Sequence, residues 1–180
     1  MSPNDDRGRF ETVVAPYLAD AQAFARWLIR NRADAEDVVQ EACVRAFRAI
    51  DQFSGSNGRA WLLTIVRNTA FTWLKEKRAE ALVSMDELNE SERLAVERGA
   101  LLESSTSPEG EMIAAADADD LERHIAALPT EFREVLVLRD MRGLDYREIA
   151  RITGAPIGTV MSRLARARQR LIGQMKQKGF

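Results

Sequence analysis

The spacing of apolar residues along this 180-residue chain is helical almost throughout, and no segment alternates apolar with polar positions as a β-strand does. We therefore predict an all-α fold. The first helical pattern covers Phe10–Arg30, where Pro16 predicts a break or kink because it lacks a backbone N–H. The second covers Asp34–Phe53, with Asp34 as the expected N-cap. Cys43 falls on its apolar face, and we expect a small buried hydrophobe rather than a reactive thiol.

A polar loop and an aromatic helix are predicted next. Residues 54–58 read Ser-Gly-Ser-Asn-Gly, a composition typical of loops. Arg59–Arg78 has helical spacing and carries Trp61, Phe71 and Trp73 on the same helix as several arginines and lysines. Aromatic rings beside cations can stack on unpaired bases and bind phosphates, but such rings can also build a core. We expect the core role for at least Trp61.

Apolar density falls after Arg78 and rises again near residue 111. The stretch 79–108 is rich in charge, Ser and Gly, which predicts a linker with at most one short helix, around Asp86–Leu102. Helical spacing resumes over Glu111–Leu128 and is broken by Pro129. A further helix is expected to be capped by Thr130 and ended by Gly143, with a core face of Phe132, Val135, Leu136, Leu138 and Met141.

Residues 144–171 have the layout of a helix-turn-helix. A short helix over Tyr146–Ile152 is followed by the turn Thr153–Pro156, where Gly154 can adopt a positive φ, and by a second helix from about Ile157. On the second helix an apolar stripe is formed by Val160, Leu164, Ala167 and Leu171. The opposite face carries Thr159, Ser162, Arg163, Arg166 and Arg170. No acidic residue follows Glu148, which favours a cationic ridge suited to phosphates and base edges. The alternative is an ordinary solvated surface.

Charge is distributed unevenly along the chain, although the net charge is only −2. Residues 79–131 contain fourteen acidic residues and three arginines, so this segment carries −11 and its two flanks together carry +9. The pattern indicates two basic modules separated by an acidic segment, rather than a general binder of polyanions.

Residue counts disfavour several classes of chemistry. A single cysteine excludes an internal disulfide and a Cys-cluster zinc site, and the single His124 argues against histidine-based catalysis or metal binding. The sequence has no Ser/His/Asp set and no phosphate-binding loop, so an enzyme is the least favoured class and no cofactor is expected. No apolar run reaches the ~18 residues of a membrane helix, and the N-terminus is polar, so we expect a cytoplasmic protein.

Four segments in a fixed order resemble a known family. They are DAEDVVQEA, RAWLLTIVRNTAFTWLKEKR, LPTEFREVLVLRDMRGLDYREIA and GTVMSRLARAR, with the acidic segment between the second and the third. Together they make the chain similar to bacterial sigma factors of the extracytoplasmic-function (ECF) group of the sigma-70 family, which keep only sigma regions 2 and 4. The resemblance implies two small helical domains: a region 2-like domain at 1–80 and a region 4-like helix-turn-helix domain at 111–180, joined by an acidic linker at 81–110.

The resemblance also implies partners and the residues that contact them. Core RNA polymerase would be bound through Asp37, Gln40 and Glu41, at positions i, i+3 and i+4 of one helix. The melted −10 element of promoter DNA would be engaged by Ser54, Gly55, Ser56, Asn57, Gly58 and Asn68. The −35 element would be read by Thr159, Ser162, Arg163 and Arg166. The implied function is promoter-directed transcription initiation under the control of an anti-sigma factor.

The sequence departs from the family pattern at two places that bear on promoter choice. The 54–58 loop is one residue shorter than usual, with Gly58-Arg59 where phenylalanine is common, and Met161 stands where a basic residue is frequent.

Two other functions remain open. One is a dimeric helix-turn-helix repressor or activator, which would leave the DAEDVVQEA segment without a role. The other is a sigma mimic that sequesters an anti-sigma protein without touching DNA, which the cationic face at Arg163 and Arg166 disfavours.

Overall fold

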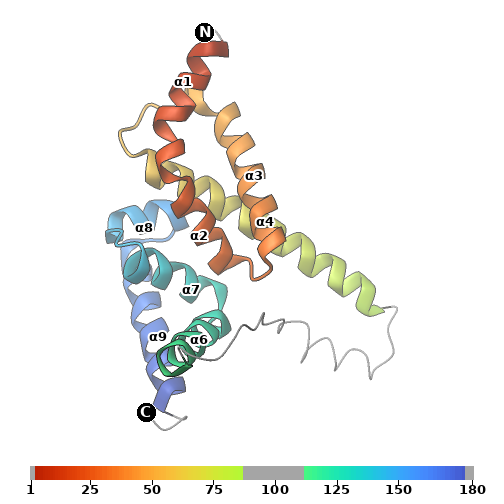
Figure 1. Ribbon diagram of the computed structural model, residues 1–180, viewed down its shortest axis with the longest axis vertical. Helices are drawn as coiled ribbons and strands as arrows, with labels where there is room; N and C mark the ends of the chain where they lie inside the picture. Colours follow the sequence, from red (N-terminus) through yellow and green to blue (C-terminus); the bar gives the residue numbers. More distant parts are fainter. Residues whose placement is uncertain (1–2, 87–111, 177–180) are drawn as a thin grey trace.

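The computed structural model describes residues 3–86 and 112–176, and all regular structure in those ranges is helical, which confirms the all-α prediction. The N-terminal bundle consists of α1 (Pro3–Val13), the 3₁₀ turn η1 (Ala15–Tyr17), α2 (Leu18–Leu28), α3 (Arg32–Arg48), the 3₁₀ turn η2 (Ile50–Gln52) and α4 (Gly58–Asp86). The C-terminal bundle consists of α6 (Met112–Ala127), α7 (Thr130–Leu136), the π-helical turn η3 (Val137–Met141), α8 (Tyr146–Thr153) and α9 (Ile157–Lys176). Figure 1 shows the two bundles in contact.

Apolar side chains of α2, α3 and α4 hold the N-terminal bundle together. Pro16 breaks the first helical pattern as predicted, because α1 ends at Val13 and α2 starts at Leu18 after the turn η1. The three helices pack against one another, and their fully buried residues include Phe24, Leu28, Ala42, Leu62, Leu63 and Val66. Each buried leucine or phenylalanine stabilises the fold by about 1.5–3 kcal/mol. This core fixes how α3 and α4 present their outer faces.

Asn31, and not Asp34, caps α3. The Asn31 side chain accepts a hydrogen bond from the Asp34 backbone N–H at 3.1 Å, and the Asn31 backbone is extended, as an N-cap requires. Asp34 lies in the first turn, where its charge favours the positive end of the helix dipole. The prediction of Asp34 as the cap is wrong, because asparagine and aspartate cap helices about equally well and both stand near the helix start.

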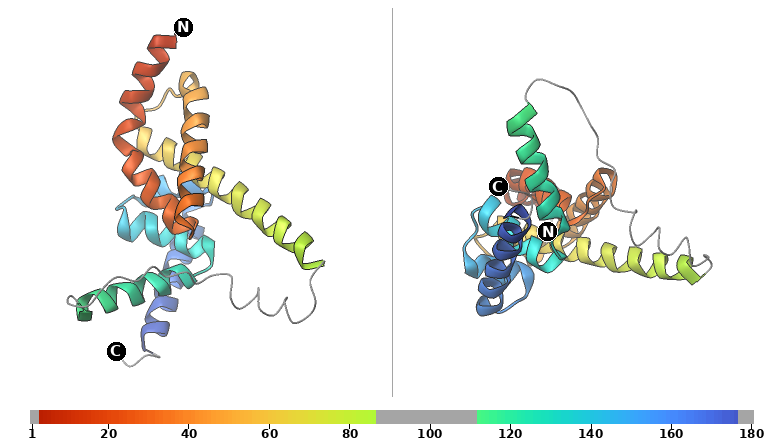
Figure 2. Two further views of the ribbon diagram at one scale, coloured as in Figure 1. Left: turned by 45° about the vertical axis from the view of Figure 1, so that its right-hand side comes forward. Right: turned by 90° about the horizontal axis from the view of Figure 1, so that it is seen from below.

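Helix α4 is longer than the sequence pattern predicts, because it continues past Arg78 to Asp86. Residues 75–80 are exposed, and Figures 1 and 2 show the C-terminal turns of α4 projecting away from both bundles. Residues 79–82 are strong helix formers, so intrinsic propensity extends the helix without help from packing. Most of the expected linker, including the short helix expected around Asp86–Leu102, lies outside the described residues.

The start of α7 differs from the prediction. Pro129 is the N-cap residue, and Thr130 is the first residue of the helix and makes no side-chain cap. The Thr130 hydroxyl instead accepts a hydrogen bond of 3.4 Å from the guanidinium of Arg133. The predicted Thr130 cap is therefore wrong, because Pro129 occupies the N-cap position and Thr130 already lies inside the helix.

The end of the same helix widens into η3. There the Arg142 N–H donates to the Val137 carbonyl at 3.0 Å, five residues back instead of four. A π-helical turn changes the phase of the residues that follow it. Met141 is accordingly 43% exposed, and its predicted place in the core is wrong. Gly143 then ends the helix at φ +70°, a conformation that glycine adopts without strain.

The helix-turn-helix forms as predicted. α8 begins with a capping box, in which the Asp145 carboxylate accepts from the Glu148 N–H at 2.8 Å and the Glu148 carboxylate accepts from the Asp145 N–H at 2.9 Å. Gly154 ends α8 at φ +68°. In α9 the residues Val160, Leu164 and Ala167 are buried and Leu171 is partly buried, so the predicted apolar stripe faces the core.

The two bundles meet along two lines of contact. α8 packs against α4, and α7 packs against α2, as Figure 1 also shows. We call this packing the closed arrangement. It brings side chains of Asn57 and α4 into contact with side chains of α8 and α7.

Candidate nucleic-acid interface

The outer face of α3 carries the residues expected to bind polymerase. Asp37, Gln40 and Glu41 are all exposed. The Glu41 carboxylate accepts a hydrogen bond from Arg45 Nε at 2.8 Å, an exposed pair of the i, i+4 type. Such a pair contributes only about 0.3–0.5 kcal/mol to stability, so this face is available for another protein.

Two apolar side chains extend this face toward the end of α3. Val44 is 43% exposed and Phe47 is 44% exposed. Their spacing from Gln40 follows the helical repeat, so the polar and apolar residues form one stripe. The Phe47 ring meets Phe10 edge-on, with 5.5 Å between ring centroids. An exposed aromatic beside charged residues is typical of protein interfaces. Phe47 does not belong to the motif-based docking set, although its helical spacing from Gln40 places it on the same face.

The 54–58 loop is anchored at its C-terminal end. Its first three residues are exposed, Asn57 is partly buried and Gly58 is buried. A Cβ atom at Gly58 would lie 2.5 Å from the Val13 carbonyl oxygen. Only glycine therefore allows α4 to start against the end of α1, so Gly58 has a packing role whatever the loop contacts.

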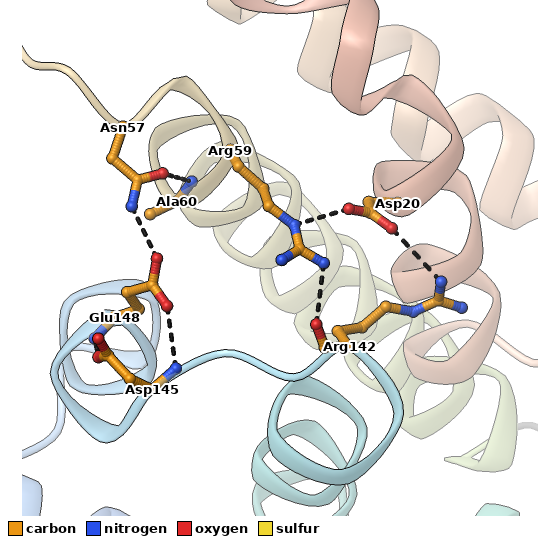
Figure 3. A network of polar contacts seen from close by, with 7 residues as sticks. All are labelled: Asp20, Asn57, Arg59, Ala60, Arg142, Asp145 and Glu148. Atoms are coloured by element: carbon orange, nitrogen blue, oxygen red, sulfur yellow. Dashed lines mark hydrogen bonds and ion pairs between the residues drawn. The ribbon is translucent and has the colours of Figure 1, made fainter.

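Asn57 joins the loop to both bundles, as Figure 3 shows. Its Oδ1 accepts from the Ala60 N–H at 2.9 Å, and its Nδ2 donates to Glu148 Oε1 at 2.7 Å. Because Glu148 also belongs to the capping box of α8, one side-chain amide links the first turns of α4 and α8. In the closed arrangement this amide is occupied by protein.

Asn68 is exposed on α4, while its neighbour Arg67 is covered by α7. The Arg67 guanidinium lies 3.9 Å from the centroid of the Phe71 ring. It donates two hydrogen bonds to Glu134, from Nε at 2.9 Å and from Nη2 at 3.2 Å. The aromatic and cationic side of α4, which the sequence suggests for single-stranded DNA, thus meets a carboxylate of the other bundle.

Glu134 is a fully buried carboxylate that no sequence motif indicated. Besides Arg67 it faces Arg163 of α9, whose Nη1 lies 3.8 Å from Glu134 Oε1. Burial raises the pKa of the Glu134 carboxyl, and the hydrogen bonds and charge of Arg67 act in the opposite direction. Its partners come from distant parts of the chain, so no local pattern could have shown them.

Arg133 makes a further link between the bundles. Its guanidinium donates to the Ala126 carbonyl at 2.5 Å and to the Leu28 carbonyl at 3.4 Å, at the C-terminal ends of α6 and α2. Burial and the nearby charge of Arg30 lower the pKa of Arg133 to about 10. The group stays charged at neutral pH and binds the negative ends of two helices.

The residues expected to read the −35 element differ in exposure. Ser162 and Arg166 are exposed on α9, and Thr159 is partly buried. The Arg163 side chain is only 24% exposed and also lies 3.6 Å from Glu131. Arg163 is therefore turned toward α7, on the flank of the predicted cationic face.

The cationic ridge of α9 is partly neutralised. Arg168 forms two hydrogen bonds with the Asp140 carboxylate, at 2.9 Å and 2.5 Å. The Arg170 guanidinium lies over the Phe132 ring, 4.7 Å from its centroid. Near the start of α9, Met161 is 50% exposed and adds an apolar group to the outer surface. The ridge is thus a mixed surface in which Arg166 and Ser162 stand beside an apolar side chain.

A second polar network crosses between the bundles (Figure 3). Arg59 of α4 donates to Asp20 of α2 at 2.6 Å and to the Arg142 carbonyl at 3.0 Å. The Arg142 side chain reaches the same Asp20 carboxylate at 3.4 Å. Asp20 therefore holds one arginine from each bundle.

Neither a metal-binding cluster nor a membrane-spanning helix is found in the parts of the chain that the structure describes. No group of three or more His, Cys, Asp and Glu side chains there is arranged to hold a metal ion. Within those same ranges no helix combines the length and apolar character needed to cross a membrane.

Two family models match the chain, in the order expected from the sequence motifs. Sigma-70 region 2 matches residues 13–80, and Sigma-70, region 4 matches residues 118–171. The first match contains the α3 face, the loop and most of α4. The second contains the helix-turn-helix.

Curated relatives cover nearly the whole chain. The ECF RNA polymerase sigma-E factor of Escherichia coli K12 is 37% identical over 165 residues, which are 91% of this chain and 85% of that protein. The sigma factor of the same name from Haemophilus influenzae is 33% identical over 174 residues, 91% of this chain and 86% of its own length.

Solved structures agree in fold. The sigma factor RpoE from Bartonella quintana, solved in complex with the anti-sigma factor NepR, superposes with a TM-score of 0.71 at 30% identity over 93% of this chain and 96% of that one. CnrH, solved with the cytosolic domain of CnrY, has the same fold at 24% identity, with a TM-score of 0.61 over 93% of this chain and 88% of its own. The chain therefore belongs to the sigma-70 family, as a member of its ECF group.

Proposed function

We propose that this protein is a transcription initiation factor that binds core RNA polymerase and directs it to specific promoters. The observation that carries the proposal is the pairing of a region 2 match with a region 4 match whose recognition helix exposes Ser162 and Arg166. Its work is binding rather than catalysis, and its location is the cytoplasm, where polymerase and promoter DNA are found.

The proposal divides the work between the two ends of the chain. Residues 1–80 would dock on polymerase and hold the melted promoter, 81–110 would link the domains, and 111–180 would read the −35 element. The docking set is Asp37, Gln40 and Glu41, to which the exposed Val44 and Phe47 are added. The −10 set is the 54–58 loop with Asn68. The −35 set is Thr159, Ser162, Arg163 and Arg166.

An anti-sigma factor is proposed as the controlling partner. Support comes from the structure of the sigma factor RpoE from Bartonella quintana, which was solved in complex with the anti-sigma factor NepR. CnrH, solved with the cytosolic domain of CnrY, supports the fold alone. Only the first exceeds 25% identity to this chain, so it carries the argument about partners.

Transcription in vitro tests the proposal directly. A pool of genomic fragments is transcribed by purified core polymerase with and without this protein, and the transcripts are sequenced. We expect new transcripts that share two promoter elements and depend on the added protein. Tight, sequence-specific DNA binding by the protein alone, with no new transcripts, would instead identify a repressor. Neither DNA binding nor transcription, with binding to an anti-sigma protein retained, would identify a sigma mimic.

A further inference from the structure

One carboxylate at the contact between the bundles faces an arginine from each proposed promoter surface. Arg67 precedes Asn68 in the −10 set, and Arg163 belongs to the −35 set. Both guanidinium groups face the buried carboxylate of Glu134, Arg67 through two hydrogen bonds and Arg163 at 3.8 Å. Asn57 of the loop is held by a second carboxylate, that of Glu148.

Arg67 binds Glu134 with the same donors that an arginine uses to bind a phosphate. A guanidinium donates two parallel N–H hydrogen bonds to a carboxylate or to a phosphate in the same planar geometry. Arg67 uses Nε and Nη2 on Glu134, and its side chain is only 18% exposed. In the closed arrangement it therefore cannot bind a phosphate of DNA as well.

The polymerase-docking stripe is left open in the same arrangement. Glu41 is exposed, and Phe47 is 44% exposed. Both lie on α3, whereas the contacts between the bundles are made by α2 and α4. The closed arrangement thus covers DNA-binding groups while it leaves the protein-binding face accessible.

We propose that Glu134 is an internal competitor for promoter phosphates, which holds Arg67 in the free protein and releases it when the bundles separate on polymerase. Arg67 is thereby assigned as an additional DNA-contacting residue, at the sugar-phosphate backbone of the melted −10 element. The inference rests on the proposed function and adds to it a named contact and the state in which that contact is blocked.

The energetics of a buried ion pair suit a contact that must open. The gain from bringing two charges together is largely offset by the loss of their hydration. Glu134 is fully buried and the Arg67 side chain is mostly buried, so the pair contributes little net stability while it remains intact. Removal of one partner is different, because it leaves the other charge buried without compensation. In Glu134→Gln one of the two acceptors becomes an N–H₂ donor that faces the guanidinium.

The test compares variants of the full-length protein without polymerase. Small-angle scattering measures the separation of the bundles, and fluorescence anisotropy measures affinity for a random-sequence duplex with a mismatched bubble. Glu134→Gln is expected to increase the radius of gyration and to bind this DNA about fivefold or more tightly, because the fraction of binding-competent protein rises. Arg67→Glu, which puts two carboxylates together, should also expand the protein but weaken DNA binding.

Glu131→Gln is the matched control. This variant removes the same charge from α7, and Glu131 also faces Arg163. Glu131 is 62% exposed, however, and lies 3.6 Å from Arg163 without a contact to the other bundle among the described ion pairs. Neither the shape nor the affinity for DNA should change appreciably in this variant. Circular dichroism establishes that each variant is folded. If Glu134→Gln is unfolded, Glu134→Asp replaces it, because this change keeps the charge but withdraws the carboxylate from Arg67.

The opposite effects on DNA binding distinguish competition from a merely structural contact. The proposal is overturned if folded variants at Glu134 and Arg67 stay as compact as the wild type, or if both change DNA affinity in the same direction. Transcription with core polymerase distinguishes a failure of internal competition from a failure of the proposed function. If the wild type directs no transcription, the proposed function fails. If it does, but the two variants behave like Glu131→Gln, internal competition alone fails.

Discussion

Arg163 and Arg166 lie close together on α9 but in different environments. Arg166 is exposed, whereas Arg163 faces Glu131 and Glu134. A bidentate contact to guanine needs a guanidinium that is free to turn into the groove. We therefore expect Arg166→Ala to cost about 1–3 kcal/mol and to relax the preference at one base pair. Promoter selection with the polymerase complex at several salt concentrations measures both effects.

Lys176 supplies the control for that measurement. It is exposed at the last turn of α9, so at most it meets phosphate. Lys176→Ala should weaken all sequences alike and lower the salt slope by about one. If Arg166→Ala behaves in the same way and keeps the wild-type base preferences, then the specificity comes from Ser162 or from DNA shape.

At Gly58 we expect alanine to lower stability, although alanine has a higher helix propensity than glycine. Alanine normally favours a helix over glycine by about 0.8–1.0 kcal/mol, but a Cβ here would meet the Val13 carbonyl oxygen at 2.5 Å. We expect Gly58→Ala to destabilise the N-terminal bundle by about 1–3 kcal/mol, as overpacking does. Urea unfolding measures the change.

Gly55→Ala is the comparison in the same loop. A Cβ at Gly55 would lie 3.5 Å from the Phe53 ring, an ordinary contact. Its stability should stay close to that of the wild type. Equal stability of both alanine variants would show that α1 can move away from Gly58 at little cost.

At the scale of the element, a substitution on the outer face of α3 tests whether this face binds polymerase. Charge reversal in Glu41→Lys should weaken binding to core polymerase about tenfold or more, a change of about 1.4 kcal/mol. The thermal melt should hardly change, because Glu41 is exposed and loses only its pair with Arg45. Glu11→Lys is the matched control, since Glu11 is an exposed acid paired with Arg7 in the same i, i+4 way on α1. If both variants bind polymerase like the wild type, this face is not the docking site.

Helices were predictable from the sequence to the extent that local forces determine them. Apolar spacing indicated the bundles and the helix-turn-helix, and Gly154 and Pro16 act as expected. Errors arose where two residues could cap the same helix about equally well, as Asn31 and Asp34 could at the start of α3. They also arose where a π-helical turn shifted the register and exposed Met141.

At the scale of the whole molecule, the sequence could not show which side chains would meet. Arg67 and Glu134 are 67 positions apart, and Asn57 and Glu148 are 91 apart. Periodicity gives the face of a helix but not the partner of that face. For this reason the candidate surfaces could be proposed from sequence motifs, whereas the contacts that cover them required the packing of the two bundles.

The exposed α3 face and the covered Arg67 have a consequence for protein in excess of polymerase. A closed copy without polymerase should leave promoters unoccupied, so transcription in vitro should rise to a plateau and stay there as wild-type protein is added. With Glu134→Gln, open copies should occupy the promoters and transcription should fall beyond the plateau. The same decline in the wild type would contradict this expectation. If the plateau holds, surplus copies of the wild-type protein are inactive, and the supply of polymerase sets the amount of transcript.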